Sequence, residues 1–271
     1  MNTIAFPKNS YRLPWKIATI LFMKTIPRFF WLNFSFKKKE IATLPEAIAN
    51  HAVRVLRLKI GDCITIFDGK NHEFSAKIAS ITKKTTTVEI QSVDTVSRES
   101  PVKITLLQAV LSADKMDFVI QKATELGVFQ IQPIFLKRSV LKLSAERLTA
   151  REKHWQSVAL SACEQCGRNK IPKILCACDF EKAILNLAQN AETADSAKIL
   201  FLPNANKTLR DFKFPQNATI LTGAEGGFDE LEIKIALQNG FSPCRLGHRI
   251  LRAETAPIAA LAALNFLNGD F

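Results

Sequence analysis

Short runs of alternating apolar and polar residues fill the chain between residues 23 and 98. Such alternation is typical of β-strands with one buried face. The strand candidates are residues 28–31, 64–67, 74–81 and 85–91. The pair Asp68-Gly69 is a strong turn signal between the second and third of them. Short strands at this spacing predict a small β-barrel.

A helical pattern interrupts these strands at residues 51–62. The apolar positions that share one helical face are Ala52, Val55 and Leu56. The cations that lie mostly off this face are Arg54, Arg57 and Lys59. On the pattern alone, these cations predict a solvated helix surface.

The pattern changes at residues 98–101, which we interpret as a linker because Pro101 disfavours a helix immediately before it. Apolar strands follow at residues 102–110, 131–135 and 199–202, and helical periodicity is found at residues 114–126 and 144–166. Asp114 is the predicted cap of the first helix. Strands that alternate with helices at this interval predict an α/β domain with a parallel sheet.

The 271 residues are 47% hydrophobic, which is enough for one large domain or two modest ones. A net charge of +12 and a pI near 9.5 favour a polyanionic partner, either a nucleic acid or an anionic membrane surface. Residues 1–22 hold three cations around an apolar piece too short to span a bilayer, so no membrane partner is expected. We expect Met23 to be the real start and residues 1–22 to be an N-terminal extension.

Six cysteines are present, and without signs of secretion we expect reduced thiols in a cytoplasmic protein. Cys163 and Cys166, together with Cys176 and Cys178, superficially match a zinc site. The second pair is spaced more closely than a zinc ribbon requires, and the first pair falls in a helical stretch. We therefore predict no metal.

Two charged loops that contain glycine stand out in the last third of the chain. The first, Gly223-Ala-Glu-Gly-Gly227, follows an apolar strand and precedes a helix that Asp229 and Glu232 are predicted to start with a capping box. The second, residues 246–256, runs into an Ala-rich helix that contains Pro257. Because the carboxyl ends of parallel strands meet at one edge of a sheet, the two loops predict a single site.

The central Glu225 argues against a phosphate site in the first loop, because a carboxylate repels phosphate at short range. A cation, ribose hydroxyls or a guanidinium would suit it, and a tight turn with a solvent-facing Glu is the structural alternative. The spacing differs from the dinucleotide fingerprint, and the P-loop lysine pattern is missing. These features disfavour a nucleotide- or phosphate-binding enzyme.

The two loops, with the sequences GAEGGFDELE and LGHRILRAETA, resemble the signature loops of the RsmE family, part of the SPOUT superfamily of knotted RNA methyltransferases. The resemblance covers nearly all of the chain after Met23. It implies a PUA-like, RNA-binding β-barrel over residues 23–98 and a SPOUT-type α/β methyltransferase domain with a deep trefoil knot over residues 99–271. It also implies a homodimer.

The same resemblance implies S-adenosyl-L-methionine as the cofactor and N3 of a uridine in 16S rRNA of the small ribosomal subunit, uridine 1498 in the standard numbering, as the acceptor. The implied catalytic residues are Arg252, Glu254 and Glu225. Arg252 is suited to stabilise negative charge on the uracil oxygens. Either carboxylate is suited to accept a proton or to orient Arg252, and a purely structural Arg–Glu pair is the alternative.

The resemblance also assigns binding residues. Those implied against the cofactor are Leu202, Leu221, Thr222, Gly223, Glu225, Gly226, Gly227, Leu246, Gly247, Ile250, Leu251, Arg252 and Thr255, with the loop 203–206 beside them. Those implied in RNA binding are Arg28, His51, Arg54, Arg57, Lys115, Gln165 and Arg168. The structural alternatives are a core histidine for His51 and a solvated helix end for Arg168.

Two positions depart from the family pattern. Ala224 replaces the usual proline of the first loop, and His248 occupies a position that is often proline. Neither change removes a candidate catalytic group. The competing functions are a non-catalytic RNA-binding or ribosome-assembly factor and a related enzyme that methylates another RNA nucleotide. Cofactor binding and product analysis discriminate between them.

Overall fold

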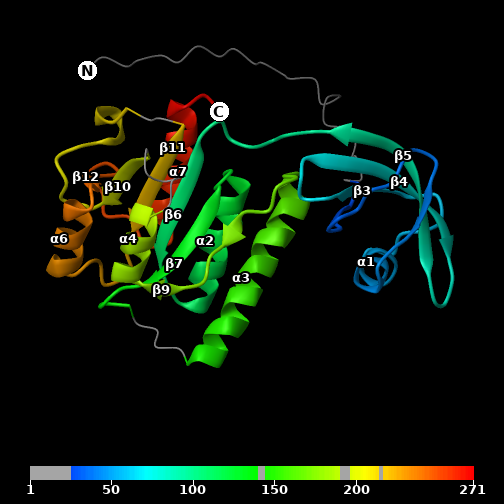
Figure 1. The fold of residues 1–271 in the computed structure, drawn as a ribbon, viewed down its shortest axis with the longest axis horizontal. Helices are drawn as coiled ribbons and strands as arrows, with labels where there is room; N and C mark the ends of the chain where they lie inside the picture. The colour runs from blue at the N-terminus through cyan, green and yellow to red at the C-terminus, as the bar shows by residue number, and fades with distance from the viewer. Residues whose placement is uncertain (1–25, 140–143, 190–195, 214–215) are drawn as a thin grey trace, which may run out of the picture.

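The structure, a computed structural model, describes residues 26–139, 144–189, 196–213 and 216–271. It contains two separate β-sheets, and the chain passes from the first to the second between Thr95 and Lys103 (Figure 1). The predicted N-terminal extension, residues 1–22, lies outside the described residues.

The first sheet has five strands in the order β1-β3-β4-β5-β2. Its strands are β1 (Arg28–Phe30), β2 (Ile41–Thr43), β3 (Cys63–Phe67), β4 (His72–Ile81) and β5 (Thr86–Thr95). Burial alternates along β4, where Phe74, Ala76 and Ile78 face the core. This alternation confirms the predicted strands, and the Asp68-Gly69 turn joins β3 to β4, with Gly69 at φ 81°.

The predicted barrel is not closed by hydrogen bonds. Within the described residues, the end strands β1 and β2 are not paired with each other, so the sheet is open. The chain between β2 and β3 instead forms α1 (Glu46–Asn50) and the π-helical turn η2 (His51–Val55). This segment packs Ala52 and Leu58 into the core of the sheet.

The second sheet is parallel throughout and has the order β12-β10-β11-β6-β7-β8, with β9 paired to β7. Its strands are β6 (Lys103–Ala109), β7 (Gln130–Phe135), β8 (Lys173–Ile174), β9 (Cys178–Asp179), β10 (Ala197–Phe201), β11 (Asn217–Thr222) and β12 (Ser242–Cys244). The predicted parallel α/β domain is confirmed. The strands β8 and β9 were not predicted, because two residues are too few to show a pattern.

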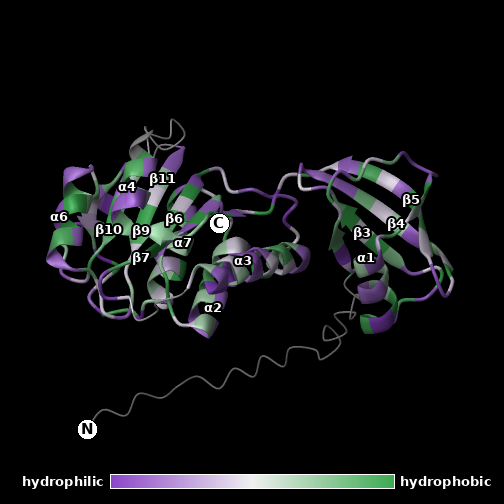
Figure 2. Cartoon of the chain, turned by 60° about the horizontal axis from the view of Figure 1, so that its bottom comes forward, coloured by the Kyte–Doolittle hydropathy of each residue, from purple (hydrophilic) through white to green (hydrophobic). Residues whose placement is uncertain are grey.

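Helices lie on both faces of the parallel sheet (Figure 2). They are α2 (Ala113–Glu125), α3 (Ala145–Cys166), α4 (Phe180–Gln189), α6 (Glu230–Gln238) and α7 (Thr255–Leu267), with a short 3₁₀ turn η3 (Leu209–Asp211). The helix α2 packs against α3 and α7, and α4 packs against α6. The prediction that Asp114 caps α2 is wrong, because Ser112 is the cap residue and Asp114 lies in the first turn.

A group of polar contacts, which we call the junction, ties the two sheets together. Arg28 Nη1 donates to Glu73 Oε1 at 2.5 Å and its Nη2 donates to Asn169 Oδ1 at 2.7 Å. Arg98 Nη1 donates to Glu73 Oε1 at 2.6 Å and to the Gly167 carbonyl at 3.0 Å. The junction thus joins β1 and β4 of the first sheet to the chain that follows α3.

Candidate active site

The loops that follow β10, β11 and β12 meet at one edge of the parallel sheet. The backbone N–H of Leu202 donates to the Cys244 carbonyl at 2.9 Å, and that of Arg245 donates to the Lys207 carbonyl at 2.9 Å. Because the three strands are neighbours and parallel, their carboxyl ends open toward the same space. The structure therefore brings the two loops of the predicted site together.

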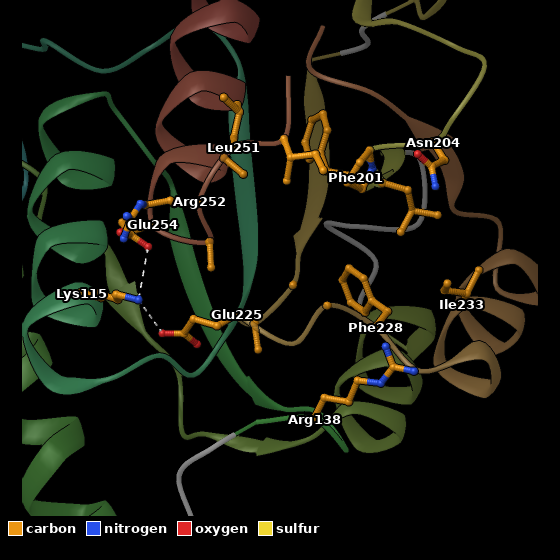
Figure 3. A pocket seen from close by; sticks show the side chains of 18 residues that line it. Lys115, Arg138, Phe201, Asn204, Glu225, Phe228, Ile233, Leu251, Arg252 and Glu254 are labelled. Atoms are coloured by element: carbon orange, nitrogen blue, oxygen red, sulfur yellow. Dashed lines mark hydrogen bonds and ion pairs between the residues drawn. The ribbon is translucent and has the colours of Figure 1, made fainter. Parts of the chain in front are cut away.

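These loops surround a cavity of about 650 Å³ (Figure 3). Its walls consist of residues 201–204, 223–225, 227–228 and 250–254, together with Lys115, Arg138, Ile233 and Ala256. Binding sites for small molecules and cofactors typically measure roughly 300–1,000 Å³ and combine apolar walls with a few polar groups. The cavity fits this description, since Phe201, Phe228 and Leu251 face Lys115 and Glu225 across it (Figure 3).

The glycines of the first loop serve different purposes. Gly227 has a φ of 67°, which a residue with a side chain rarely adopts. Gly223 and Gly226 do not have a positive φ, but a Cβ at Gly223 would lie 3.0 Å from the Phe228 ring. A Cβ at Gly226 would lie 3.0 Å from Cβ of Arg138. Two of the three glycines are thus needed for close packing rather than for an unusual backbone.

The predicted capping box at the start of α6 is confirmed. The Asp229 side chain accepts from the Leu231 N–H at 3.1 Å, and Glu232 Oε2 accepts from the Asp229 N–H at 2.7 Å. The Leu231 N–H, followed by Lys137, lowers the pKa of Asp229. Glu232 Oε1 also accepts from the Lys137 N–H at 2.7 Å, so the same helix end fixes the loop after β7.

Three charged side chains form a cluster on one wall of the cavity. Lys115 Nζ donates to Glu225 Oε1 at 3.0 Å and lies 3.8 Å from Glu254 Oε2 (Figure 3). Burial raises the pKa of Glu225, but hydrogen bonds from its own N–H and from Lys115 outweigh burial, and the net pKa is lowered. Glu254 Oε2 is buried and has no hydrogen-bond partner among the described residues.

Arg252 lines the same cavity but belongs to no ion pair in the described part of the chain. The structural Arg–Glu pair is therefore not the arrangement found here. Lys115, one of the predicted RNA-binding residues, is the cation that contacts both carboxylates instead. Its sequence position, early in the helix after β6, gives no sign of this contact, because Glu225 is 110 residues away.

Two family models match this chain. The model described as "RNA methyltransferase domain" matches residues 98–265, and the model described as "RNA methyltransferase PUA domain" matches residues 44–91. The chain is 35% identical to the ribosomal RNA small subunit methyltransferase E of Buchnera aphidicola subsp. Acyrthosiphon pisum over 257 residues, which cover 94% of this chain and 98% of the relative. This chain belongs to the ribosomal RNA small subunit methyltransferase E family.

Solved structures agree with the family assignment. The ribosomal RNA small subunit methyltransferase E of Neisseria gonorrhoeae bound to S-adenosyl methionine superimposes with a TM-score of 0.82 at 37% identity, covering 91% of this chain and 99% of that one. A methyltransferase of Legionella pneumophila in complex with the bound cofactor S-adenosylmethionine gives a TM-score of 0.83 at 35% identity, covering 89% and 98%. The first sheet is thus a PUA-type domain, and the second is the methyltransferase domain of this family.

The residues predicted to bind the cofactor fall into three groups. Those on the wall of the cavity are Leu202, Gly223, Glu225, Gly227, Ile250, Leu251 and Arg252, together with Pro203 and Asn204 of the predicted neighbouring loop. Leu246 and Gly247 line a smaller adjoining cavity of about 60 Å³. Those that line neither are Leu221, Thr222, Gly226 and Thr255. Leu221 and Thr222 are buried within β11, and Thr222 Oγ1 donates to Gln108 Oε1 at 2.7 Å.

Several wall residues are not among the predicted site residues, notably Arg138, Phe201 and Phe228. Arg138 Nη1 donates to the Gly226 carbonyl at 3.3 Å, which fixes the loop after β7 against the glycine-rich loop. Arg138 follows a strand of the parallel sheet, so the rule that sites form at carboxyl ends of strands was the available signal.

Two of the predicted RNA-binding arginines are structural. The Arg168 side chain is only 4% exposed, and its Nε and Nη1 donate to Glu99 Oε1 at 3.1 Å and to the Thr124 carbonyl at 2.9 Å. Arg28 is held in the junction and is 13% exposed. The RNA-contact prediction is wrong for Arg168, and so is the alternative of a solvated helix end, because its donors are committed inside the protein.

Of the other predicted RNA-binding residues, His51, Arg54, Arg57 and Gln165 are exposed, and Lys115 is half-buried in the cavity wall. The ring of His51 packs edge-on against Phe29 at a centroid distance of 5.6 Å. The predicted shared face of Ala52, Val55 and Leu56 is wrong, because the π-helical turn ends at Val55 and only Ala52 is buried.

The described residues contain no group of three or more His, Cys, Asp or Glu side chains arranged to hold a metal ion. The zinc alternative therefore finds no support in the cysteine positions: Cys163 is buried in α3, while Cys176 is exposed. In the same part of the chain, no helix is both long and apolar enough to cross a bilayer.

Proposed function

We propose that this protein transfers the methyl group of S-adenosyl-L-methionine to N3 of a uridine in the 16S rRNA of the small ribosomal subunit, uridine 1498 in the standard numbering. The observation that carries the proposal is the cavity in which Lys115, Glu225, Glu254 and Arg252 meet at the carboxyl edge of the parallel sheet. Membership of the ribosomal RNA small subunit methyltransferase E family supports it.

The cavity suits the proposed cofactor. When bound, S-adenosylmethionine supplies a methyl group on a positively charged sulfur. Glu225 and Glu254 place two carboxylates beside the single ammonium of Lys115, so the cationic sulfur is expected near these carboxylates. Arg138 and Arg252 line the remaining wall, so the cavity offers groups of both charges. The buried Glu254 Oε2 without a hydrogen-bond partner is a position where a ligand contact is expected. Phe201, Leu202 and Leu251 offer apolar surface for an adenosine group.

The charged residues have distinct proposed roles. Uridine N3–H is a weak acid, so its methylation requires that the proton be removed and the negative charge on the uracil oxygens be stabilised. Arg252, exposed on the wall and without an ion-pair partner among the described residues, is placed to stabilise that charge. Glu254 accepts the proton, and Lys115 positions both carboxylates through its contacts at 3.0 and 3.8 Å.

We extend the proposal to the whole molecule. Residues 23–98 form the RNA-binding domain and residues 99–271 the catalytic domain, in a cytoplasmic homodimer. The exposed Phe266, with 69% of its surface accessible on α7, supports contact with a second copy. After β12 the chain lies beside the loop that follows β10 and then leads to α7. The helix α7 packs against α2 and β6, and this chain path supports a trefoil knot.

The direct test is methyl transfer by the purified protein to small ribosomal subunits that lack the modification. We expect Arg252→Ala and Glu254→Gln each to lower kcat by about 100-fold, in the range found for lost charge-stabilising and proton-transfer groups. Lys115→Met should lower kcat more than Lys115→Arg does. The matched control is His248→Ala, which changes an exposed residue of the same loop outside both cavity walls.

Three results would contradict parts of the proposal. Methyl transfer to an atom other than N3 of uridine would contradict the proposed target, while the proposed cofactor site would stand. Binding of S-adenosylmethionine without any transfer would favour a non-catalytic RNA-binding factor. Full activity of Arg252→Ala would remove Arg252 from the chemistry.

A further inference from the structure

The segment between Ala52 and Leu58 is anchored at both ends and bulges outward between them. Ala52 and Leu58 are buried in the core of the PUA-type domain, with exposed fractions of 0% and 4%. The Leu56 N–H donates to the His51 carbonyl at 2.9 Å, five residues back, which defines the π-helical turn. Arg57 then has a φ of 55°. Both features are uncommon in ordinary helices and are found preferentially at functional sites.

Three apolar side chains project from this bulge and the residues after it. Val55, Leu56 and Ile60 are 67%, 41% and 63% exposed, and we call them the apolar tip. Single exposed apolar residues are ordinary, whereas three within six positions expose apolar side chains repeatedly along one short segment. Figure 2 shows hydrophobic and hydrophilic residues mixed at α1 and the adjoining chain.

Cations alternate with the apolar tip along the same segment. Arg54, Arg57 and Lys59 are all exposed, and within the described residues none of their side chains has an ion pair or hydrogen bond. Cations that lack an internal acidic partner are available to phosphates. Proteins bind unpaired nucleotides by combining such cations with aromatic side chains against the base faces, and a base taken out of its stack also packs between aromatic or apolar side chains.

We propose that the apolar tip contacts unstacked bases of the substrate RNA, while Arg54, Arg57 and Lys59 bind the phosphates on either side. Residues 54–60 hold three cations and no carboxylate, which favours a polyanion such as RNA over a protein partner. The inference rests on the proposed function in one respect. N3 lies on the pairing edge of uracil, so the target base must be unpaired before the reaction.

The test compares the full-length wild type with the triple variant Val55→Ser, Leu56→Ser, Ile60→Ser. The probes are a small-subunit rRNA hairpin that presents the target uridine unpaired and a fully paired RNA of the same length. The variant should bind the hairpin about tenfold or more weakly, with unchanged affinity for the paired RNA. The slope of log Kd against log salt should be unchanged, because no phosphate contact is removed.

The matched control is Leu231→Ser on α6, which removes an equally exposed side chain, 63% accessible, from the other domain. It should leave both affinities unchanged. Thermal unfolding of every variant should match the wild type, since the altered side chains are exposed.

Unchanged affinity of the triple variant for the hairpin would overturn the inference, as would an equal loss for both RNAs. Unchanged RNA affinity with an altered sedimentation coefficient would assign the apolar tip to a protein contact instead. Binding is measured without S-adenosylmethionine, so a wild type that binds but never methylates would contradict the proposed function and leave the binding comparison intact.

Discussion

The arginines of the junction and those beside the apolar tip look alike in the sequence and differ completely in the structure. Arg28 and Arg98 share the Glu73 carboxylate, at distances of 2.5 and 2.6 Å. Arg54 and Arg57 are exposed, and the described residues provide no acidic partner for either. Arg168, near the junction, is paired with Glu99 and buried.

The difference shows which part of the net charge of +12 is available to a polyanion. A guanidinium that is paired and partly buried has already exchanged its hydration for protein contacts, and separating it costs free energy. An exposed, unpaired guanidinium is fully hydrated, so it can bind a phosphate without breaking an internal contact. The junction cations therefore hold the two domains together, and the cations beside the apolar tip remain available for RNA.

The largest effect is expected at Arg168. The variant Arg168→Met leaves the Glu99 carboxylate and the Thr124 carbonyl without their donor. We expect the free energy of unfolding to fall by about 3 kcal/mol in urea denaturation, as when one partner of a buried pair is removed. The exposed Arg147 of α3 is the matched control, and Arg147→Met should change the free energy by less than about 0.5 kcal/mol. Comparable losses in the two variants would contradict the structural role of Arg168.

A smaller loss is expected at Glu73. Burial raises the pKa of Glu73, but hydrogen bonds from Arg98 and Arg28 outweigh burial and lower it below its ordinary value of 4.5. A lowered folded-state pKa contributes stability above pH 4.5, and this stability is lost as the pH falls through the folded-state value. Glu73→Gln should therefore lower the free energy of unfolding by about 2 kcal/mol at neutral pH, and the deficit should shrink in acid.

The measurement is urea unfolding of the wild type and Glu73→Gln across the acidic pH range. Glu89→Gln on β5 is the control, because the described residues provide no ion pair for Glu89. A deficit that stays constant with pH would show that the Glu73 charge is not what the two arginines stabilise.

Arg54 and Arg57, beside the apolar tip, should affect RNA affinity and leave the stability of the protein unchanged. In the double variant Arg54→Gln, Arg57→Gln we expect a free energy of unfolding within about 0.5 kcal/mol of the wild type. Affinity for single-stranded rRNA should fall about tenfold, and the salt slope should decrease by about 1.4, since each phosphate contact contributes about 0.7. Filter binding over a series of salt concentrations measures both quantities. An unchanged slope would mean that these arginines do not contact phosphates.

The smallest expected change in stability is at Arg57, where a glycine variant distinguishes the contribution of the backbone conformation from that of the charge. Its φ of 55° is unfavourable for a residue with a side chain, whereas glycine adopts it readily. Arg57→Gly should raise the free energy of unfolding by about 0.5–1 kcal/mol while weakening RNA binding. Arg54→Gly removes the same charge where φ is not positive, so it should destabilise the protein. Destabilisation by both variants would show that the Arg57 backbone is not strained.

Much of the fold could be predicted because its signals are local. Alternating burial along β4, the apolar parallel strands and the capping box of Asp229 and Glu232 each depend on residues a few positions apart. The two loops of the site could be predicted for the same reason, since each follows a strand of the parallel sheet.

The remaining features depend on partners far apart in the chain. Arg28 meets Asn169 across 141 positions, and Lys115 meets Glu225 across 110. No local pattern distinguishes a cation that will find such a partner from one that will stay exposed. The outward bulge after His51 was missed for a related reason, because anchoring by Ala52 and Leu58 overrides the helical spacing of Val55 and Leu56.

The proposed N3-methylation of a uridine is tested most directly by nucleoside mass spectrometry of small-subunit rRNA. The samples come from a strain that lacks this gene and from the same strain supplied with the wild type or Arg252→Ala. We predict that 3-methyluridine disappears in the deletion strain and returns with the wild type alone. An unchanged level of 3-methyluridine in the deletion strain would contradict the proposed reaction.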